Sequence, residues 1–219
     1  MKIFNLNVNF SEKQIFKDLT IEFKPNTLTA VLGNSGVGKT TLLNCIAGIV
    51  PYTGRIEDIG EVSYMFQEPR LIDTSTVREN LLYVRGGKKA GKEVYEEIEE
   101  LLEIVGLSEE IDAPVSTLSG GMQSRVSLAR AFLYPSTTLL MDEPFKSLDI
   151  ALAIKLRKSL VKLLELRPRT VVFVTHDVEE AIELGDKIIV LSGRPAEVVL
   201  SLDRGETGLK ESLVKALVD

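Results

Sequence analysis

One stretch decides the fold of this chain: Gly33-Asn34-Ser35-Gly36-Val37-Gly38-Lys39-Thr40. It follows the pattern G-x-x-x-x-G-K-[ST]. The apolar run over residues 28–32 favours a β-strand, and the run over 41–47 is typical of a buried helix. We therefore expect a strand, a glycine-rich loop and a helix in direct succession. A chance glycine-rich turn would share only part of this context.

Strand, loop and helix in this order are suited to bind a nucleoside triphosphate. Free backbone N–H groups at a helix N-terminus point at the phosphates, and the three glycines let the backbone come close. Lys39 places an ammonium near the β- and γ-phosphates, and the Thr40 hydroxyl is placed to bind Mg²⁺. The predicted nucleotide-binding residues here are Gly33, Asn34, Ser35, Gly36, Val37, Gly38, Lys39, Thr40 and Thr41.

The composition predicts an ordinary globular chain. Its 219 residues are 44% hydrophobic and 26% charged, which is enough for one domain with a full core. The net charge of −6 argues against nucleic acid as the main partner, because nucleic acid usually needs a basic face. The single cysteine, Cys45, fits a reducing compartment. No stretch has the character of a signal peptide or a membrane span, so we expect a cytoplasmic chain or one held at a membrane by a partner.

The N-terminal part predicts an antiparallel pair of half-buried strands. Apolar and polar residues alternate over 4–10 and again over 19–24. Phe10 ends the first strand, where its ring either stacks on a purine base or packs at the edge of the core. A short β segment starts at Gly54, and a strand over 61–66 has Gln67 at its end.

Residues 68–118 differ from their surroundings and are predicted as a helical insertion. Apolar residues at 94, 98, 101, 102 and 105 have helical spacing, and the other face of this helix is acidic. Residues 86–91 are predicted as a loop. The segment Leu118–Gln123 then precedes another helix over 125–132.

The later part of the chain places acidic residues at a strand end. An apolar strand over 138–142 ends in Asp142 and is followed at once by Glu143. A magnesium site beside a phosphate loop needs an acid in this position. A long helix with leucines from 152 to 164 stops near Pro168, and strands follow over 171–175, ending at His176, and over 187–191. A helix over 205–219 is predicted to close the fold.

These motifs occur in the order found in the nucleotide-binding subunit of ATP-binding cassette (ABC) transporters, which the chain resembles over nearly its whole length. The matching features are the phosphate loop 33–40, Gln67, the signature Leu118–Gln123, the strand Leu139–Glu143, Ser147-Leu148-Asp149 and His176. The signature is the most specific, because other phosphate-loop enzymes lack it. The resemblance implies an α/β P-loop fold of the ABC-cassette type over residues 1–219. Its parts are a mixed or parallel core sheet, an antiparallel β layer and a helical subdomain over about 68–118.

The resemblance also implies the cofactors ATP and Mg²⁺ and a role for each site residue. Glu143 is expected to be the general base, and His176 is expected to contact the γ-phosphate and fix the attacking water. Thr40, Gln67 and Asp142 are the expected Mg²⁺ ligands, and Gln67 also couples the γ-phosphate to the helical insertion. The remaining expected nucleotide contacts are the base-stacking Phe10, the signature residues Ser119, Gly120 and Gly121, and Asp149.

The signature implies a dimer, because in the family it faces the γ-phosphate bound on the other subunit. We expect a homodimer that sandwiches two ATP molecules head to tail, docked on integral-membrane permease subunits at the cytoplasmic face of the membrane. An extracytoplasmic solute-binding protein would act through the permease. Candidate permease contacts are Leu71, Ile72, Leu81, Leu82 and Tyr83, unless they belong to the subdomain core.

A narrower resemblance points to importers. Residues 66–71, 142–145 and 192–195 look like the import ATPases of the nitrate, sulfonate and taurine group, which take up small anionic or heterocyclic nutrients. The chain departs from the family in the short segment between residues 39 and 67 and in Lys146, where a small residue is usual. Because the chain ends soon after the fold should close, no regulatory domain is expected. The rival interpretations are a soluble ABC-type ATPase, an exporter ATPase and a small-molecule kinase.

Overall fold

The computed structural model describes residues 1–11, 13–146 and 148–218 of the chain. They form two compact units. Unit 1 comprises Met1–Val62, Thr137–Glu143 and Arg169–Asp219, and unit 2 comprises Ser63–Ser136 and Pro144–Pro168. The predicted insertion over 68–118 falls within unit 2, and the assignment of the whole chain to a single domain stays a prediction. Ser147 of the predicted motifs lies outside the described residues.

An antiparallel sheet forms one layer of unit 1. Its strands are β1 (Lys2–Phe10), β2 (Lys13–Glu22) and β4 (Thr53–Glu57), in the order β2-β1-β4. Leu6 of β1 faces Leu19 of β2 in the antiparallel register. The alternating pattern of the N-terminal sequence is therefore confirmed as a strand pair, and the segment near Gly54 is its third strand.

The main sheet of unit 1 carries the phosphate loop. The strands of this sheet that lie wholly within unit 1 have the order β6-β7-β3-β8-β9, formed by β3 (Leu28–Gly33), β6 (Thr138–Asp142), β7 (Thr170–Val174), β8 (Lys187–Ser192) and β9 (Glu197–Asp203). The first four run parallel, and β9 is antiparallel to β8. Every residue of β3, β6 and β7 is buried, as expected for parallel strands covered on both faces. The predicted apolar strands are confirmed, and β9 is a strand that was not predicted.

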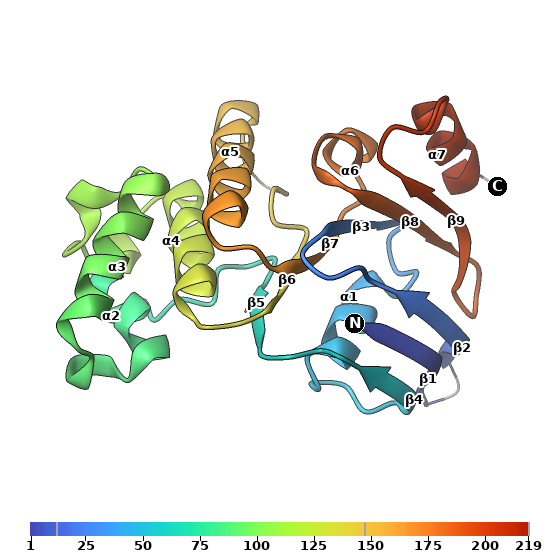
Figure 1. Ribbon diagram of the computed structural model, residues 1–219, viewed down its shortest axis with the longest axis horizontal. Helices are drawn as coiled ribbons and strands as arrows, with labels where there is room; N and C mark the ends of the chain where they lie inside the picture. Colours follow the sequence, from blue (N-terminus) through green and yellow to red (C-terminus); the bar gives the residue numbers. More distant parts are fainter. Residues whose placement is uncertain (12, 147, 219) are drawn as a thin grey trace. The chain divides into compact units, whose positions relative to one another are not determined.

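Three helices complete unit 1 (Figure 1). They are α1 (Lys39–Ile46), α6 (Val178–Leu184) and α7 (Leu209–Val218). Helix α1 follows the glycine loop directly, as predicted, and α7 confirms the closing helix. Lys210 of α7 forms an ion pair with Glu179 of α6. This pair joins the last helix to the helix that follows His176.

Unit 2 is mostly helical. After β5 (Val62–Met65), it contains α2 (Val77–Leu82), α3 (Lys92–Ile104), α4 (Gly120–Leu133) and α5 (Ile150–Leu166). Short 3-10 turns lie at Tyr83–Arg85, Gly87–Lys89, Ser108–Glu110 and Val115–Thr117. The predicted apolar face of α3 is confirmed, since its residues at 94, 98, 101 and 102 and the following residue 105 are all buried. Leu156, Leu160 and Leu163 provide the buried face of α5.

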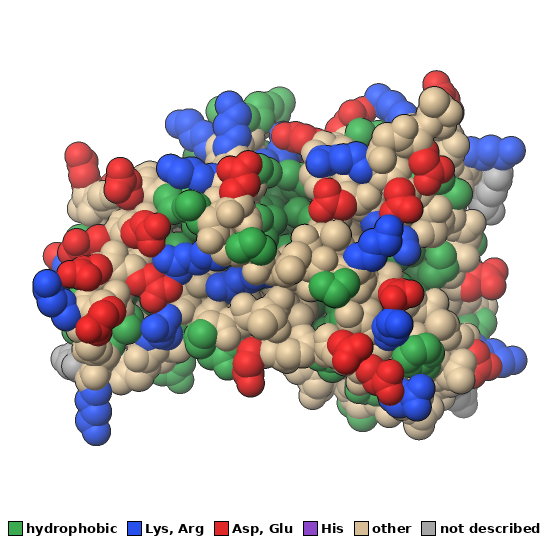
Figure 2. All heavy atoms as spheres, in the orientation of Figure 1, with side chains coloured by type: hydrophobic (Ala, Val, Ile, Leu, Met, Phe, Trp, Pro, Cys, Tyr) green, Lys and Arg blue, Asp and Glu red, His purple; other side chains and the backbone are tan. Residues whose placement is uncertain are grey.

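A cluster of ion pairs ties the helices of unit 2 together. Glu97 of α3 accepts a hydrogen bond from Arg85 at 2.9 Å and one from Arg167 at the end of α5. Arg167 also donates to Glu100 at 2.7 Å, and Arg85 donates to the carbonyl of Leu133, the last residue of α4, at 2.9 Å. Figure 2 shows that acidic and basic side chains are interspersed on the visible face.

The structure bears on two features considered from the composition, a membrane-spanning segment and the single cysteine. Among the residues that the structure describes, no helix combines the length and the apolar character needed to cross a bilayer. Cys45 is buried in α1, and its burial raises the pKa of the thiol to about 11. At neutral pH the thiol therefore stays protonated and serves as a small packing group.

Candidate functional site

The glycines at the two ends of the loop are required by close neighbours. A Cβ on Gly33 would lie 2.6 Å from the backbone oxygen of Leu191, because β3 and β8 pair at this position. A Cβ on Gly38, whose φ is +118°, would lie 2.8 Å from a methyl carbon of Ile15. Around Gly36, with φ of +77°, no atom lies within 4 Å of such a Cβ. The loop is thus held at both ends and open in its middle.

Lys39 completes the loop by reaching back to it. Its Nζ donates to the carbonyl of Gly33 at 2.7 Å and to that of Asn34 at 3.2 Å, and the residue is 6% exposed. The ammonium therefore lies at the loop, where the predicted phosphates would bind. The side chain of Asn34 turns elsewhere, since its Nδ2 donates to the carbonyl of Leu217 in α7 at 3.2 Å.

Thr40 and Asp142 meet although they are 102 residues apart in sequence. The Thr40 hydroxyl donates to Asp142 Oδ1 at 3.1 Å. Helix α1 supplies the hydroxyl, and the carboxyl end of β6 supplies the carboxylate. Two oxygens on one edge of a Mg²⁺ octahedron with bonds of about 2.1 Å lie about 3 Å apart. The spacing and the hard oxygen donors of this pair therefore fit the predicted ion.

Glu143 has an unusual backbone conformation. Its φ is +43°, and the other non-glycine residues with positive φ in the described part of the chain are Asn, Asp or Ser, types that tolerate the left-handed region better. Its N–H donates to the carbonyl of Val174 in β7 at 3.0 Å. A left-handed conformation costs about 1–3 kcal/mol and is found mainly at functional sites. Here it directs the carboxylate next to Asp142 toward the loop after β7.

That loop carries His176. Its Nδ1 lies 3.4 Å from Glu143 Oε2, and its side chain is 57% exposed while that of Glu143 is 13% exposed. The predicted base and the predicted water-fixing histidine are therefore neighbours. An exposed imidazole beside a sheltered carboxylate leaves one side of the pair open to a ligand.

Residues next to His176 hold its turn and were not predicted. Thr175 Oγ1 donates to Glu180 Oε2 at 2.6 Å and accepts from the N–H of Asp177 at 3.0 Å. Asp177 Oδ1 accepts from the N–H groups of Glu179 and Glu180 and so caps α6. An Asp followed two residues later by the acidic pair Glu179 and Glu180 is the sequence signal for this cap.

The other predicted residues of unit 1 differ in their exposure. Phe10, the last residue of β1, is 47% exposed, so its ring is accessible to a ligand. Ser35 is exposed, Val37 is buried and Thr41 is half-buried. Their roles in nucleotide binding stay predictions.

Unit 2 holds the remaining predicted residues. Ser119 Oγ accepts from the N–H of Met122 at 3.3 Å and caps α4, and Asp149 Oδ1 accepts from the N–H of Leu152 at 2.9 Å and caps α5. Gly121 allows close packing, because a Cβ there would lie 2.7 Å from Leu152 Cδ1, whereas Gly120 has open space. Gln67 is exposed just after β5. Their contacts with a nucleotide stay predictions.

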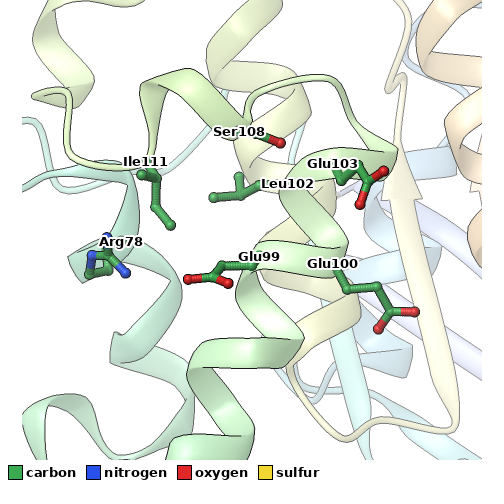
Figure 3. Close-up of a pocket in the computed structure, with 7 residues that line it drawn as sticks. All are labelled: Arg78, Glu99, Glu100, Leu102, Glu103, Ser108 and Ile111. Carbon is green, nitrogen blue, oxygen red and sulfur yellow. The ribbon is translucent and has the colours of Figure 1, made fainter.

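A separate pocket of about 480 Å³ lies within unit 2 (Figure 3). Arg78 lines it and is held by Asp112 through hydrogen bonds of 2.8 and 3.1 Å. These bonds lower the pKa of the Asp112 carboxyl. None of the predicted site residues lines this pocket, which is bounded by Arg78, Glu99, Glu100, Leu102, Glu103, Ser108 and Ile111.

Similarity to known proteins identifies the family of this chain. Residues 16–146 match the family model described as ABC transporter. The chain is 38% identical over 200 residues to the aliphatic sulfonates import ATP-binding protein SsuB 1 of Pseudomonas savastanoi pv. phaseolicola, covering 90% of this chain and 82% of the relative. It is 35% identical over 215 residues to the taurine import ATP-binding protein TauB of Roseobacter denitrificans, covering 90% and 80%.

A solved structure has a fold similar to that of this chain. The cbiO1 protein from Clostridium perfringens, part of the ABC transporter complex cbiONQ, matches with a TM-score of 0.84 and 25% identity, over 99% of this chain and 91% of that one. The expected ABC-cassette fold is confirmed. The motif resemblance and the match over most of the chain lead to one conclusion: this chain belongs to the ABC transporter family, as an ATP-binding subunit that hydrolyses ATP.

Proposed function

We propose that the chain supplies the energy for import of a small anionic nutrient of the sulfonate or taurine type. The relatives named above are import ATP-binding proteins for these solutes. Membership of a transporter family implies a membrane-embedded permease partner, so the chain is membrane-associated. We further propose that it docks at the cytoplasmic face and responds to an extracytoplasmic solute-binding protein through that permease.

The observation that carries the proposal is the gathering of chemical groups at one edge of the parallel sheet. Lys39, Thr40, Asp142, Glu143 and His176 come from the ends of β3, β6 and β7 or from the start of α1. Ligands of open parallel sheets bind at the carboxyl ends of the strands. A cation, a hydroxyl, two carboxylates and an imidazole in this place are suited to triphosphate hydrolysis.

Mg²⁺ would be held by Thr40 and Asp142, with Gln67 as a further ligand. Bound there, the ion would supply positive charge that offsets the charge developing on the phosphates. The backbone amides of the loop and the Lys39 ammonium would hold the phosphate oxygens, and Phe10 would stack on the base. Exchanging the carbonyls of Gly33 and Asn34 for phosphate oxygens keeps the Lys39 ammonium satisfied throughout.

Glu143 would act as the general base. It would accept a proton at Oε from the attacking water, while His176 on its exposed side orients the water and contacts the γ-phosphate. The contact of Glu143 Oε2 with His176 Nδ1 at 3.4 Å supports this role, because it places the two side chains where both can reach one water. The strained backbone of Glu143 holds the carboxylate where the chemistry needs it.

We also propose that two copies of the chain form a head-to-tail sandwich around two ATP molecules. Ser119, Gly120 and Gly121 at the start of α4 would bind the γ-phosphate of the other copy, with Asp149 at the seam. ATP would favour the closed pair, and product release would open it. For nucleic acid we propose no role.

The permease would contact the exposed part of the segment after Gln67. Ile72 and Tyr83 are 38% and 71% exposed, and Leu71 is half-buried. Leu81 and Leu82 are buried in the helical core at 0% and 4% exposure. For these two leucines of α2 the alternative, a place in the subdomain core, therefore holds.

The test is ATP-dependent dimerisation of Glu143→Gln, measured by light scattering with and without Mg-ATP. Removing the base while keeping the binding groups should trap the dimer only when ATP is present, whereas a Glu197→Gln control should hydrolyse ATP and not accumulate as a dimer. If Glu143→Gln binds ATP tightly but stays monomeric, the sandwich is contradicted. If it binds no ATP, the assignment of the phosphate loop fails.

A further inference from the structure

Two aromatic rings stack where β5 passes into the segment carrying Gln67. Tyr64 and Phe66 are two residues apart, so both rings lie on the same side of the extended chain, while Ser63 and Met65 are buried on the opposite side. The two ring centroids are 4.0 Å apart, and the ring planes differ by 10°. The rings therefore form a flat, half-buried platform.

Arg70 covers this platform from the other side. Its Cζ lies 3.9 Å from the centroid of the Phe66 ring. The backbone can return because it bends at Gln67 and Glu68, and the N–H of Leu71 donates to the carbonyl of Pro69 at 2.9 Å, which fixes a tight turn around Arg70. A guanidinium stacked on an aromatic face is attracted by the negative charge of the ring face and by dispersion. The loop 66–70 is thus closed by a contact between the side chains at its two ends.

Gln67 is the first residue inside this closed loop. Its side chain is exposed, and an exposed side chain on an open loop would sample many positions. Closing a short loop removes much of that freedom before any ligand binds. The three-layer arrangement of Tyr64, Phe66 and Arg70 therefore restricts the backbone from which the Gln67 amide projects.

We propose that Phe66 and Arg70 are positioning residues for Gln67, and that the stack they form with Tyr64 holds the amide ready for the nucleotide and its metal ion. This inference rests on the proposed role of Gln67 in ATP hydrolysis. It adds two residues outside the predicted nucleotide contacts, neither of which needs to touch the nucleotide. Any movement of Gln67 that signals to the permease must carry the stack along or open it.

The first test replaces the guanidinium. Arg70→Met keeps much of the side-chain length and removes the charge, so the loop loses its closing contact. In the full-length chain we expect kcat for ATP hydrolysis to fall about five- to tenfold, a loss of the size expected from one cation–π contact. The KM for ATP should change less than about twofold, because the phosphate loop in unit 1 carries ATP binding. The Mg²⁺ concentration for half-maximal activity should rise, because Gln67 is a proposed ligand.

Two matched variants separate positioning from general damage. Arg70→Lys keeps a cation that can lie over the ring, so it should restore part of kcat and of the Mg²⁺ response. Arg55→Met removes an arginine that covers Phe4 at 5.0 Å in the β1–β4 sheet, and it should leave kcat and the Mg²⁺ response unchanged. If Arg70→Met behaves like Arg55→Met, the inference is overturned.

A spectroscopic test covers the case in which Arg70→Met folds poorly. The chain contains no Trp, so Phe66→Trp places a single indole in the stack, and Tyr83→Trp places one at an exposed site 71% open to solvent. Mg-ATP should change the emission of Phe66→Trp and leave that of Tyr83→Trp unchanged. ATP binding without any change at Phe66→Trp overturns the inference alone, whereas loss of ATP binding in the unsubstituted chain overturns the proposed function.

Discussion

Unit 1 and unit 2 use their polar side chains for different purposes. In unit 1 one set of polar groups gathers at the carboxyl ends of the strands, where Thr40 meets Asp142 and Glu143 meets His176. In unit 2 a cluster of polar contacts links the helices through Glu97 and its two arginines. The first set leaves groups facing a space for a ligand, and the second set satisfies its charges internally.

The difference explains where backbone strain is found. Glu143 adopts a left-handed conformation in unit 1, which costs free energy and persists only when neighbouring strands hold it. In unit 2 the predicted contacts Ser119 and Asp149 are ordinary helix caps with extended backbones. Strain at a site of chemistry and regular capping at a site of assembly agree with the proposed division of labour.

The largest effect that would separate the two units is expected from Lys39→Ala. Removing the ammonium proposed to bind the phosphates should lower ATP hydrolysis by about 10²–10³-fold and weaken ATP binding. The free energy of unfolding should change little, because the bonds to the carbonyls of Gly33 and Asn34 hold a charge rather than the core. Steady-state hydrolysis and urea unfolding of the same preparation check this. A large loss of unfolding free energy alongside the loss of hydrolysis would contradict the proposed difference between the two units.

Leu160→Ala should have the opposite profile. Leu160 is fully buried on α5, and truncating a buried leucine costs about 3 kcal/mol of unfolding free energy. ATP binding to the phosphate loop should persist under conditions where the variant is folded. Unfolding followed by circular dichroism and nucleotide titration measure the two quantities, with Leu166→Ala, 53% exposed at the end of the same helix, as the control. If the free energy of ATP binding falls by more than the free energy of unfolding, the proposed difference between the two units is contradicted.

Glu97→Gln tests whether the polar groups of unit 2 hold its helices together. Its carboxylate is 22% exposed and joins Arg85 and Arg167, so removing the charge leaves two partly sheltered arginines short of a partner. We expect a loss of about 1–2 kcal/mol, less than for a fully buried pair because solvent screens the site.

The neighbouring Glu96→Gln is the control for that loss. Glu96 pairs with Lys92 on the open surface of α3, with exposed fractions of 63% and 87%, so this change should be nearly silent. Equal thermal midpoints for both variants would show that the cluster around Glu97 does not hold the helices together.

The smallest expected effect concerns acid stability. Hydrogen bonds from Arg78 lower the pKa of Asp112 in the folded protein. Because the folded pKa lies below the unfolded one, the pair stabilises the protein at neutral pH, and this contribution is lost as pH falls through the folded pKa. Asp112→Asn should therefore differ from the parent slightly at pH 7 and not at all in strong acid, as measured by thermal unfolding across pH. A difference that grows toward acid would contradict the sign.

Local signals in the sequence predicted most of the chemistry. The phosphate loop, Asp142 and Glu143 stand next to apolar strands, so their place at a strand end follows from neighbours in the chain. The contact between Glu143 and His176 was not predicted: the family resemblance implied only that both act on the attacking water, and no local rule joins residues 33 positions apart. Such a contact depends on β6 and β7 pairing in the parallel register.

Other features were missed for physical reasons. Strand β9 has half-buried residues 198, 200 and 202 between exposed ones, but the apolar Val199 at an exposed position interrupts the apolar–polar alternation in the sequence. Helices α2 and α6 have six and seven residues, too few for a helical period to be recognised. The stack of Arg70 on Phe66 depends on the bend at residues 67 and 68, and side-chain contacts of this kind leave no periodic trace in a sequence.

The glycines of the phosphate loop have a consequence for sequence searches. Gly33 is held by the β3–β8 pairing and Gly38 by the antiparallel layer, whereas Gly36 has open space around it. The first and last glycines are therefore required by close packing against neighbouring strands. The middle glycine is required only by a backbone angle that Asn can also adopt. A search that weights all three equally would discard folded relatives with Asn in the middle. It would also keep chance matches that have no parallel sheet behind them.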